Sequence, residues 1–299
     1  MTAPGHPPDY PPEFIHLNAA DPAWLDALPD LLASLAARWS LTIGHYFPGI
    51  RYNYVAPATR ADGTPCVLKV SRHGELPQEI AALRIWAGDG AVRVLESDPA
   101  LGALLLEQLQ PGTMLSTVAA ADDDAATTIA ADILRRLWRP IPAGHGLRSL
   151  ESGAPPTTAI ATAILAGIGG FPVALFRRAD ALRHDLLAST TEQTVLHGDL
   201  HHFNILRAQR APWLAIDPKG LAGDRCFDIC QFLRNPHPGP IDPALNRRRL
   251  DIFCAELRLD RERTKAWCVV HAVLDACWDY EEGEPWAHKV AYAEETQSF

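Results

Sequence analysis

The sequence lacks several features that would narrow its class at once. Its six cysteines form no CxxC pair, and a chain of 299 residues is long enough to bury a core without disulfides. We therefore expect reduced thiols. The N-terminus has neither the basic start nor the apolar run of a signal peptide, so nothing in it directs export and a cytoplasmic location is expected.

The chain also has no excess of basic residues. Its 27 Lys and Arg against 36 Asp and Glu give a formal net charge of −9, and such a surface repels a nucleic-acid backbone. We therefore expect no nucleic-acid partner, whereas a small polycation would be attracted. A hydrophobic fraction of 47% with 21% charged residues is typical of globular proteins and excludes disordered and fibrous classes.

No hydrophobic run qualifies as a membrane span. The stretch at 157–176 is uncharged for about the length of a bilayer, but it is rich in Ala, Thr and Gly, and Gly-Gly is followed by Phe-Pro. These residues insert weakly and break helices. We therefore expect a buried helix that ends near Gly169, and no membrane partner.

What the sequence does contain is a change of pattern near Pro111. A leading helix at 22–39 follows Asp21, which can cap it, and β-rich runs with one inserted helix come next. Helical periodicity dominates beyond Pro111. The pattern predicts an α+β protein whose parts are a proline-rich segment at 1–20, a small β-rich lobe at 21–109 and a larger, mainly helical lobe at 110–299.

The most informative stretch is VLHGDLHHFNIL, residues 195–206, in which polar residues lie on a loop between two short apolar runs. A further strand ends at Asp217. If the two following strands pair as a hairpin with residue 205 opposite residue 216, Asn204 faces Asp217, with Cα atoms about 4.5 to 5.5 Å apart. Asp199, at the tip of the loop, can project into the same space.

These three side chains suit phosphoryl transfer. Two carboxylates and an amide oxygen are ligands for Mg²⁺, which keeps several waters and binds phosphate oxygens. Such a reaction asks the protein mainly for positioning and charge neutralisation. A carboxylate without a metal to hold can orient the attacking hydroxyl and accept its proton, and Asp199 is the candidate.

The same residues carry a family resemblance. HGDLHHFN resembles the HxDxxxxN catalytic loop of protein-kinase-like enzymes, and IDPKG places Asp217 at the position of their DFG aspartate. With PCVLKV and ALLLEQLQPGTML upstream and GDRCFDICQFLRNP downstream, the chain resembles the aminoglycoside phosphotransferases over about residues 45–240. It is most similar to their streptomycin 6-phosphotransferase and hydroxyurea phosphotransferase branch.

The resemblance implies a bilobal protein-kinase-like fold and an ATP-dependent O-phosphotransferase. It would transfer the γ-phosphate to a small cationic acceptor, above all the 6-OH of streptomycin, and thereby confer antibiotic resistance. Lys69 would contact the phosphates of ATP and pair with Glu79, for which Glu75 is the alternative one turn earlier. The backbone carbonyl of Glu107 and the amide of Leu109 would contact adenine.

The resemblance also assigns roles around the loop. Asn204 and Asp217 would hold Mg²⁺, and Asp199 would be the catalytic base. His197 would brace the loop. Asp228, on a helix opened just before it, would hold the loop through hydrogen bonds to its backbone.

Acceptor-binding candidates come from the loop and from the C-terminal run LDACWDYEEGEPW, 274–286. Carboxylates there could compensate ammonium or guanidinium groups, and Asp275 and Asp279 share a face at helical spacing. The alternative is a helix with a solvated acidic end. His202 could also touch the acceptor, although a loop histidine bonded to the backbone is the simpler interpretation.

Three other hypotheses stay open. Hydroxyurea or another small alcohol could be the acceptor. Because no GxGxxG precedes Lys69, and 44–54 offers only Gly44 and Gly49, the chain could be a catalytically silent kinase-like binding module. A zinc metallohydrolase is the third, although no HxH or HExxH supports it. It would use the loop side chains His197, Asp199, His201 and His202.

Overall fold

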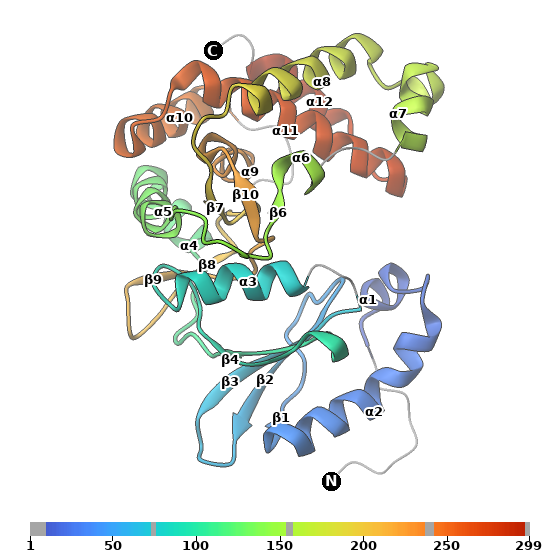
Figure 1. Cartoon of the computed structure of the whole chain (residues 1–299), viewed down its shortest axis with the longest axis vertical. Coiled ribbons are helices and arrows are strands. Elements are labelled where there is room, and N and C mark those ends of the chain that lie inside the picture. Colours follow the sequence, from blue (N-terminus) through green and yellow to red (C-terminus); the bar gives the residue numbers. More distant parts are fainter. Residues whose placement is uncertain (1–9, 73–75, 154–157, 237–241, 297–299) are drawn as a thin grey trace.

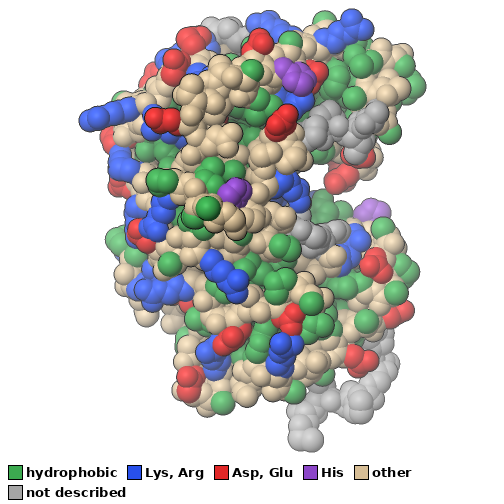
Figure 2. All heavy atoms as spheres, viewed as in Figure 1, with side chains coloured by type: hydrophobic (Ala, Val, Ile, Leu, Met, Phe, Trp, Pro, Cys, Tyr) green, Lys and Arg blue, Asp and Glu red, His purple; other side chains and the backbone are tan. Residues whose placement is uncertain are grey.

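The computed structural model describes residues 10–72, 76–153, 158–236 and 242–296. Over these residues the chain forms one lobe built on a sheet and a second built mainly of helices, drawn below and above in Figure 1. The predicted α+β class is therefore confirmed. The space-filling view shows a notch between the lobes on the right of the molecule (Figure 2).

The sheet lobe has five antiparallel strands in the order β1-β2-β3-β5-β4. Its centre is the hairpin of β2 and β3, and Gly63 in the turn has φ +85°, which favours glycine. The elements of this lobe are α1 (Pro12–Leu17), α2 (Pro22–Trp39), β1 (Leu41–Ile43), β2 (Tyr54–Arg60), β3 (Pro65–Val70), α3 (Leu76–Trp86), β4 (Val94–Asp98), η1 (Pro99–Leu101) and β5 (Ala103–Glu107).

Alternation along β3 determines what each face of the sheet meets. Cys66, Leu68 and Val70 pack with α1 and α2 in one hydrophobic cluster, whereas Val67 packs against the cluster that contains α3. Because side chains alternate along a strand, Lys69 lies on the side of Val67. The strand pattern therefore directs Lys69 toward α3, which lies between the sheet and the upper lobe (Figure 1).

The helical lobe surrounds two small β structures, a three-stranded sheet in the order β6-β10-β7 and the hairpin β8-β9. Its elements are α4 (Ser116–Ala119), α5 (Asp123–Leu137), β6 (Arg148–Ser149), α6 (Leu150–Gly153), α7 (Thr158–Leu165), η2 (Ile168–Gly170), α8 (Val173–Ala188), β7 (Thr194–Leu196), β8 (Ile205–Arg207), β9 (Trp213–Ala215), β10 (Leu221–Gly223), η3 (Arg225–Phe227), α9 (Cys230–Leu233), α10 (Pro243–Leu257), α11 (Arg261–Glu282) and α12 (Ala287–Thr296).

The uncharged stretch at 157–176 differs from its prediction. Its helix α7 ends at Leu165, before Gly167, which has φ +74°. Only one face of α7 is covered, since Ile160 and Ile164 are buried while Leu165 is exposed. Within the ranges that the structure describes, no helix is both long and apolar enough to span a bilayer.

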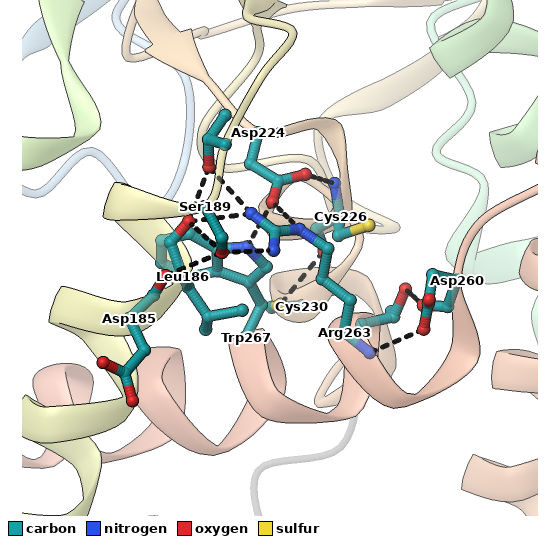
Figure 3. A network of polar contacts seen from close by, with 11 residues as sticks. Asp185, Leu186, Ser189, Asp224, Cys226, Cys230, Asp260, Arg263 and Trp267 are labelled. Carbon is teal, nitrogen blue, oxygen red and sulfur yellow. Dashed lines mark hydrogen bonds and ion pairs between the residues drawn. The ribbon is translucent and has the colours of Figure 1, made fainter.

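A polar network fixes the segment after β10 to the long helix α11 (Figure 3). The carboxylate of Asp224 accepts hydrogen bonds from Arg263 Nε at 2.5 Å and Trp267 Nε1 at 2.7 Å. Arg263 also donates to the Leu186 carbonyl of α8 at 2.8 Å. Asp224 is buried, so these charge-assisted bonds stabilise the base from which Asp228 reaches the catalytic-loop motif.

Candidate active site

The first part of the site is a buried lysine shared by two carboxylates. Lys69 Nζ of β3 donates to Glu79 Oε2 of α3 at 2.6 Å and also to Asp217 Oδ1. The Lys69 and Glu79 side chains are 7% and 6% exposed, but that of Asp217 is 42% exposed. Asp217 is therefore the member that a ligand can reach from solvent. Glu75, the alternative partner, lies outside the described residues.

Charge and burial oppose each other in this trio. Burial acts to lower the pKa of Lys69, but the Asp217 and Glu79 carboxylates outweigh it and raise that pKa. Burial raises the pKa of Glu79 to about 7 despite the nearby Lys69. Loss of hydration acts to raise the pKa of Asp217. The nearby Lys69 and Lys219 ammonium groups outweigh it and hold that pKa below the usual range. Lys69 and Asp217 are therefore charged at neutral pH.

Two backbone features bring Asp217 to α3. Asp217 has φ +59°, so the chain turns sharply as it leaves β9. Gly220 follows with φ +62°, and a Cβ there would lie 2.1 Å from the carbonyl oxygen of Gln78. Glycine is therefore required in IDPKG for the close approach to the residue that precedes Glu79.

The hairpin that carries Asn204 has a different register from the predicted one. Ile205 lies opposite Ala215, not residue 216, and the Ile216 N–H donates to the Asn204 carbonyl at 2.9 Å. The shift arises because Ala208 donates to the Pro212 carbonyl at 3.4 Å, which closes the turn one residue earlier than expected. Asp217 therefore follows the residue opposite Asn204 instead of facing it.

The backbone of the loop between β7 and β8 is held by the side chain of Asp228. Asp228 accepts hydrogen bonds from the backbone N–H groups of His197 at 3.0 Å and Gly198 at 2.6 Å, and from Trp138 Nε1 at 3.0 Å. It is the C-cap of the short helix η3 that Asp224 opens, not a residue within a longer helix. His197 is fully buried, and its Nε2 contacts the Ile216 carbonyl at 2.9 Å.

His197 is a neutral side chain in this arrangement. Burial lowers its pKa to about 3, so Nε2 donates its hydrogen to the Ile216 carbonyl, and Nδ1 faces the Asp199 N–H at 3.3 Å. This single ring links the catalytic-loop motif to the residue before Asp217. The contacts are those of a brace and not of a metal ligand.

The side chain of Asn204 contacts the loop that precedes it. Its Nδ2 donates to the Asp199 carbonyl at 3.0 Å and contacts His201 Nε2 at 3.2 Å. Both contacts use the nitrogen, which leaves the amide oxygen as the group available to a cation. Together with the exposed carboxylate of Asp217, this donor set is of the hard-oxygen type that Mg²⁺ prefers, so the residues present fit that ion.

Asp199 lies in a largely buried and mainly acidic environment. Burial raises the pKa of Asp199 to about 7, with a smaller lowering by Lys219, while Asp217 and Asp275 also raise it. His201 Nε2 is 3.8 Å from Asp199 Oδ1, and burial lowers the pKa of His201 to about 4, so this imidazole is neutral. Asp199 therefore retains the basicity that a proton acceptor needs.

Strand β5, which precedes the boundary between the lobes, ends beside the β8-β9 turn. Glu107 uses its side chain to bind Arg210 Nε through both carboxylate oxygens, each at 2.9 Å, and to accept from the Arg93 N–H at 2.8 Å. Leu109 packs against the main core. The sequence indicated the backbone of this segment but not Arg210, because no local pattern links the turn to Glu107.

The acceptor candidates are less exposed than the sequence suggested. Asp275 pairs with Arg234 Nη1 at 2.6 Å, and Lys289 Nζ lies 3.1 Å from Asp275 and 2.6 Å from Asp279. The two aspartates do share one helix face, but an acceptor cation would compete with Lys289 for them. His202 is fully buried and stacks on Phe232, so an acceptor contact would require it to become exposed.

The zinc hypothesis finds no support in the described ranges. No group of three or more His, Cys, Asp or Glu side chains there is arranged to hold a metal ion. The cysteines are all unpaired thiols, as expected. Cys226 and Cys230, one turn apart, are buried.

Comparisons with known proteins agree with this geometry. A family model described as "Aminoglycoside/hydroxyurea antibiotic resistance kinase" matches residues 38–283. The chain is 38% identical to a streptomycin 6-kinase of Streptomyces glaucescens over 87% of this chain and 86% of that protein. It is also 38% identical to a hydroxyurea phosphotransferase of Kitasatospora aureofaciens over 89% of this chain and 77% of that protein.

Solved structures share the fold at lower identity. Choline kinase LicA from Streptococcus pneumoniae superposes with a TM-score of 0.60 at 13% identity, covering 92% of this chain and 100% of that one. A thermostable mutant of aminoglycoside phosphotransferase APH(4)-Ia, in ternary complex with ADP and hygromycin B, gives 0.59 at 14% identity, covering 89% and 96%. The predicted bilobal kinase-like fold is thus confirmed.

Proposed function

The chain belongs to the aminoglycoside/hydroxyurea antibiotic resistance kinase family, and on that premise we propose that it phosphorylates a hydroxyl of streptomycin at the expense of ATP. The protein is a phosphotransferase with an alcohol group as acceptor. The observation that carries the proposal is the convergence of Lys69, Glu79 and Asp217 next to the loop that bears Asp199 and Asn204.

The nucleotide side of the mechanism follows from the buried trio. Lys69 presents an ammonium that is charged and held by Glu79, so it can bind phosphate oxygens of ATP when Asp217 turns to a metal ion. Asn204 and Asp217 would hold Mg²⁺, which would neutralise charge on the phosphates. The backbone at Glu107 and Leu109 would contact adenine, and the Arg210 side chain holds Glu107 in place.

The acceptor side depends on Asp199. Its carboxylate would accept a hydrogen bond from the acceptor hydroxyl, orient it toward the γ-phosphate, and take up its proton as the new bond forms. His197 and Asp228 hold the loop backbone so that the carboxylate keeps this position. Little covalent chemistry is asked of the protein, so rate depends mainly on this positioning.

Hydroxyurea is the second candidate acceptor. The chain is as similar to the hydroxyurea phosphotransferase as to the streptomycin 6-kinase. In addition, Asp275 and Asp279 are already compensated by Arg234 and Lys289. A site with balanced charge accepts an uncharged substrate without an energetic penalty for unpaired carboxylates.

The test compares phosphate transfer from ATP to streptomycin and to hydroxyurea, with the product mass as the readout. Asp199→Ala should abolish transfer while leaving nucleotide binding largely intact, and Asp26→Ala, an exposed residue of α2, is the matched control. Undiminished transfer by Asp199→Ala would refute the assignment of the base. Failure of the wild-type protein on both acceptors would refute the proposed substrates.

A further inference from the structure

Trp86, the last residue of α3, joins this helix to the helical lobe. It is fully buried. Its Nε1 donates a hydrogen bond to the Leu137 carbonyl at the end of α5, with 2.7 Å between nitrogen and oxygen. Its ring stacks on the His197 ring at a centroid distance of 6.3 Å and an interplanar angle of 16°. One side chain of the sheet lobe therefore contacts the imidazole that braces the catalytic-loop motif.

The chain that follows α3 pairs with strand β9 of the helical lobe. The Val92 N–H donates to the Ala215 carbonyl, and the Ala215 N–H donates to the Gly90 carbonyl, both at 2.9 Å. Ala215 is the last residue of β9 and lies two residues before Asp217. The backbone after Trp86 is thus attached to the segment that delivers the metal-binding candidate.

Charged groups add to this attachment at the surface. Arg139 Nη1 donates to the Ile85 carbonyl at 3.2 Å, and Arg139 also pairs with Asp89. Arg136 Nη2 lies 2.7 Å from Asp89 Oδ1. The Asp89 side chain is 53% exposed, and exposed ion pairs contribute little to stability. The buried indole of Trp86 is therefore the main side-chain contact that fixes this end of α3.

The other end of α3 also meets the helical lobe, where Gln78 lies against Gly220. Glu79 therefore stands between two attachments to the helical lobe, whereas its partner Lys69 belongs to strand β3 of the sheet. A helix that is held at both ends presents its side chains at a fixed place. The carboxylates of Glu79 and Asp217 are thus kept together as a pair of acceptors for the Lys69 ammonium.

We propose that Trp86 is a positioning residue for phosphoryl transfer, which docks α3 on the ring of His197 and thereby holds Glu79 in place before ATP binds. This inference rests on the proposed function. Two effects follow from the same contact. On the nucleotide side, a fixed Glu79 orients the Lys69 ammonium toward the phosphates. On the acceptor side, the stacked indole keeps His197, and with it the Asp199 backbone, at the position that transfer requires.

A buried tryptophan also fills the core, and a double-mutant cycle separates that role from positioning. The variant Trp86→Leu removes the hydrogen bond and the stacked ring and leaves a cavity, so the Tm falls in any case. If α3 is also released, the Kd for ATP should rise about threefold to tenfold and kcat should fall about tenfold or more. In a Glu79→Gln background the same substitution should change the Kd by less than about twofold, because the carboxylate that Trp86 positions is already absent.

Assays at about pH 8 keep Glu79 ionised, since burial raises its pKa to about 7. Trp86→Phe keeps an aromatic ring beside His197 but has no N–H for Leu137, so its Kd and kcat should lie between those of wild type and Trp86→Leu. Phe176→Leu is the matched control, because Phe176 is a buried ring of a separate hydrophobic cluster. It should lower the Tm as well, but its Kd for ATP and its kcat, measured well below both Tm values, should stay within about twofold of wild type.

Two results would overturn the inference. If Trp86→Leu lowers the Tm as Phe176→Leu does but keeps a wild-type Kd and kcat, Trp86 only fills the core. If its effect on the Kd is equally large in the Glu79→Gln background, Trp86 does not act through Glu79. Should Trp86→Leu fail to fold, Trp86→Phe takes its place in the same cycle and the same comparison decides. Because the Kd for ATP is measured without an acceptor, the cycle still decides if the wild-type protein transfers phosphate to neither streptomycin nor hydroxyurea, a result that refutes only the proposed function.

Discussion

Replacing Asp228 by Asn tests how the catalytic-loop motif is held. The carboxylate receives three N–H donors and is 2% exposed. In the variant one of the two oxygens becomes an NH₂ group. Because Oδ2 serves His197 and Trp138 while Oδ1 serves only Gly198, the least costly orientation places the NH₂ against the Gly198 N–H, donor against donor.

The magnitude follows from that single mismatch. Losing one charge-assisted hydrogen bond costs about 1.5 to 3 kcal/mol, and leaving a buried N–H unsatisfied costs about 1 to 3 kcal/mol. Burial raises the pKa of Asp228 to about 6, so the carboxylate is ionised at neutral pH. A neutral amide is less costly to bury than this charge, which offsets part of the lost hydrogen-bond energy. We therefore expect a loss of roughly 2 to 4 kcal/mol in the free energy of unfolding.

Urea unfolding at neutral pH measures this loss as a lower midpoint with an unchanged slope. The kcat should fall as well, because the displaced Gly198 immediately precedes Asp199. Asp185→Asn, exposed on α8, is the control and should change stability by less than about 0.5 kcal/mol. A loss below about 1 kcal/mol in Asp228→Asn, with normal kcat, would show that these hydrogen bonds do not hold the loop.

Two further substitutions probe the two sides of the site by steady-state kinetics. Arg210→Ala removes the guanidinium that fixes the Glu107 carboxylate, so the KM for ATP should rise about threefold to tenfold with kcat nearly unchanged; an unaltered KM would separate Arg210 from nucleotide binding. Lys289→Met removes the cation beside Asp279 and Asp275. The KM for streptomycin should then fall about threefold to tenfold while that for uncharged hydroxyurea stays constant, and an equal change for both acceptors would contradict an electrostatic role.

Sequence reasoning found the groups that are determined by local patterns. The family resemblance assigned Lys69 and Glu79 to their roles, and motif spacing located the Asp199 loop. The hairpin register was wrong by one residue because turn closure at Pro212 depends on a single backbone hydrogen bond. Such a bond has no composition signal that distinguishes it from the alternative turn.

Groups whose roles depend on several distant elements were missed. Arg234 follows a short apolar helix, and nothing in its neighbourhood announces its partners. Only the packing of α11 beside α9 brings His271 and Asp275 to its guanidinium. A weak signal existed in the spacing of Gln231 and Arg234, which are neighbours on one turn of a helix, but the spacing does not identify the groups of α11 that hold Arg234.

The hydrophobic core described above has a practical consequence for protein engineering. One continuous cluster contains Trp86 of α3 and Leu106 of β5 together with Val195 and Ile205 beside the catalytic loop. The boundary drawn at 109–110 therefore crosses buried contacts instead of a polar linker. Chimeras that exchange one lobe between relatives would place unmatched side chains in this cluster, and each half expressed alone would expose it to water. The chain is expected to denature in one step and to tolerate recombination only where both sides of the core come from one parent.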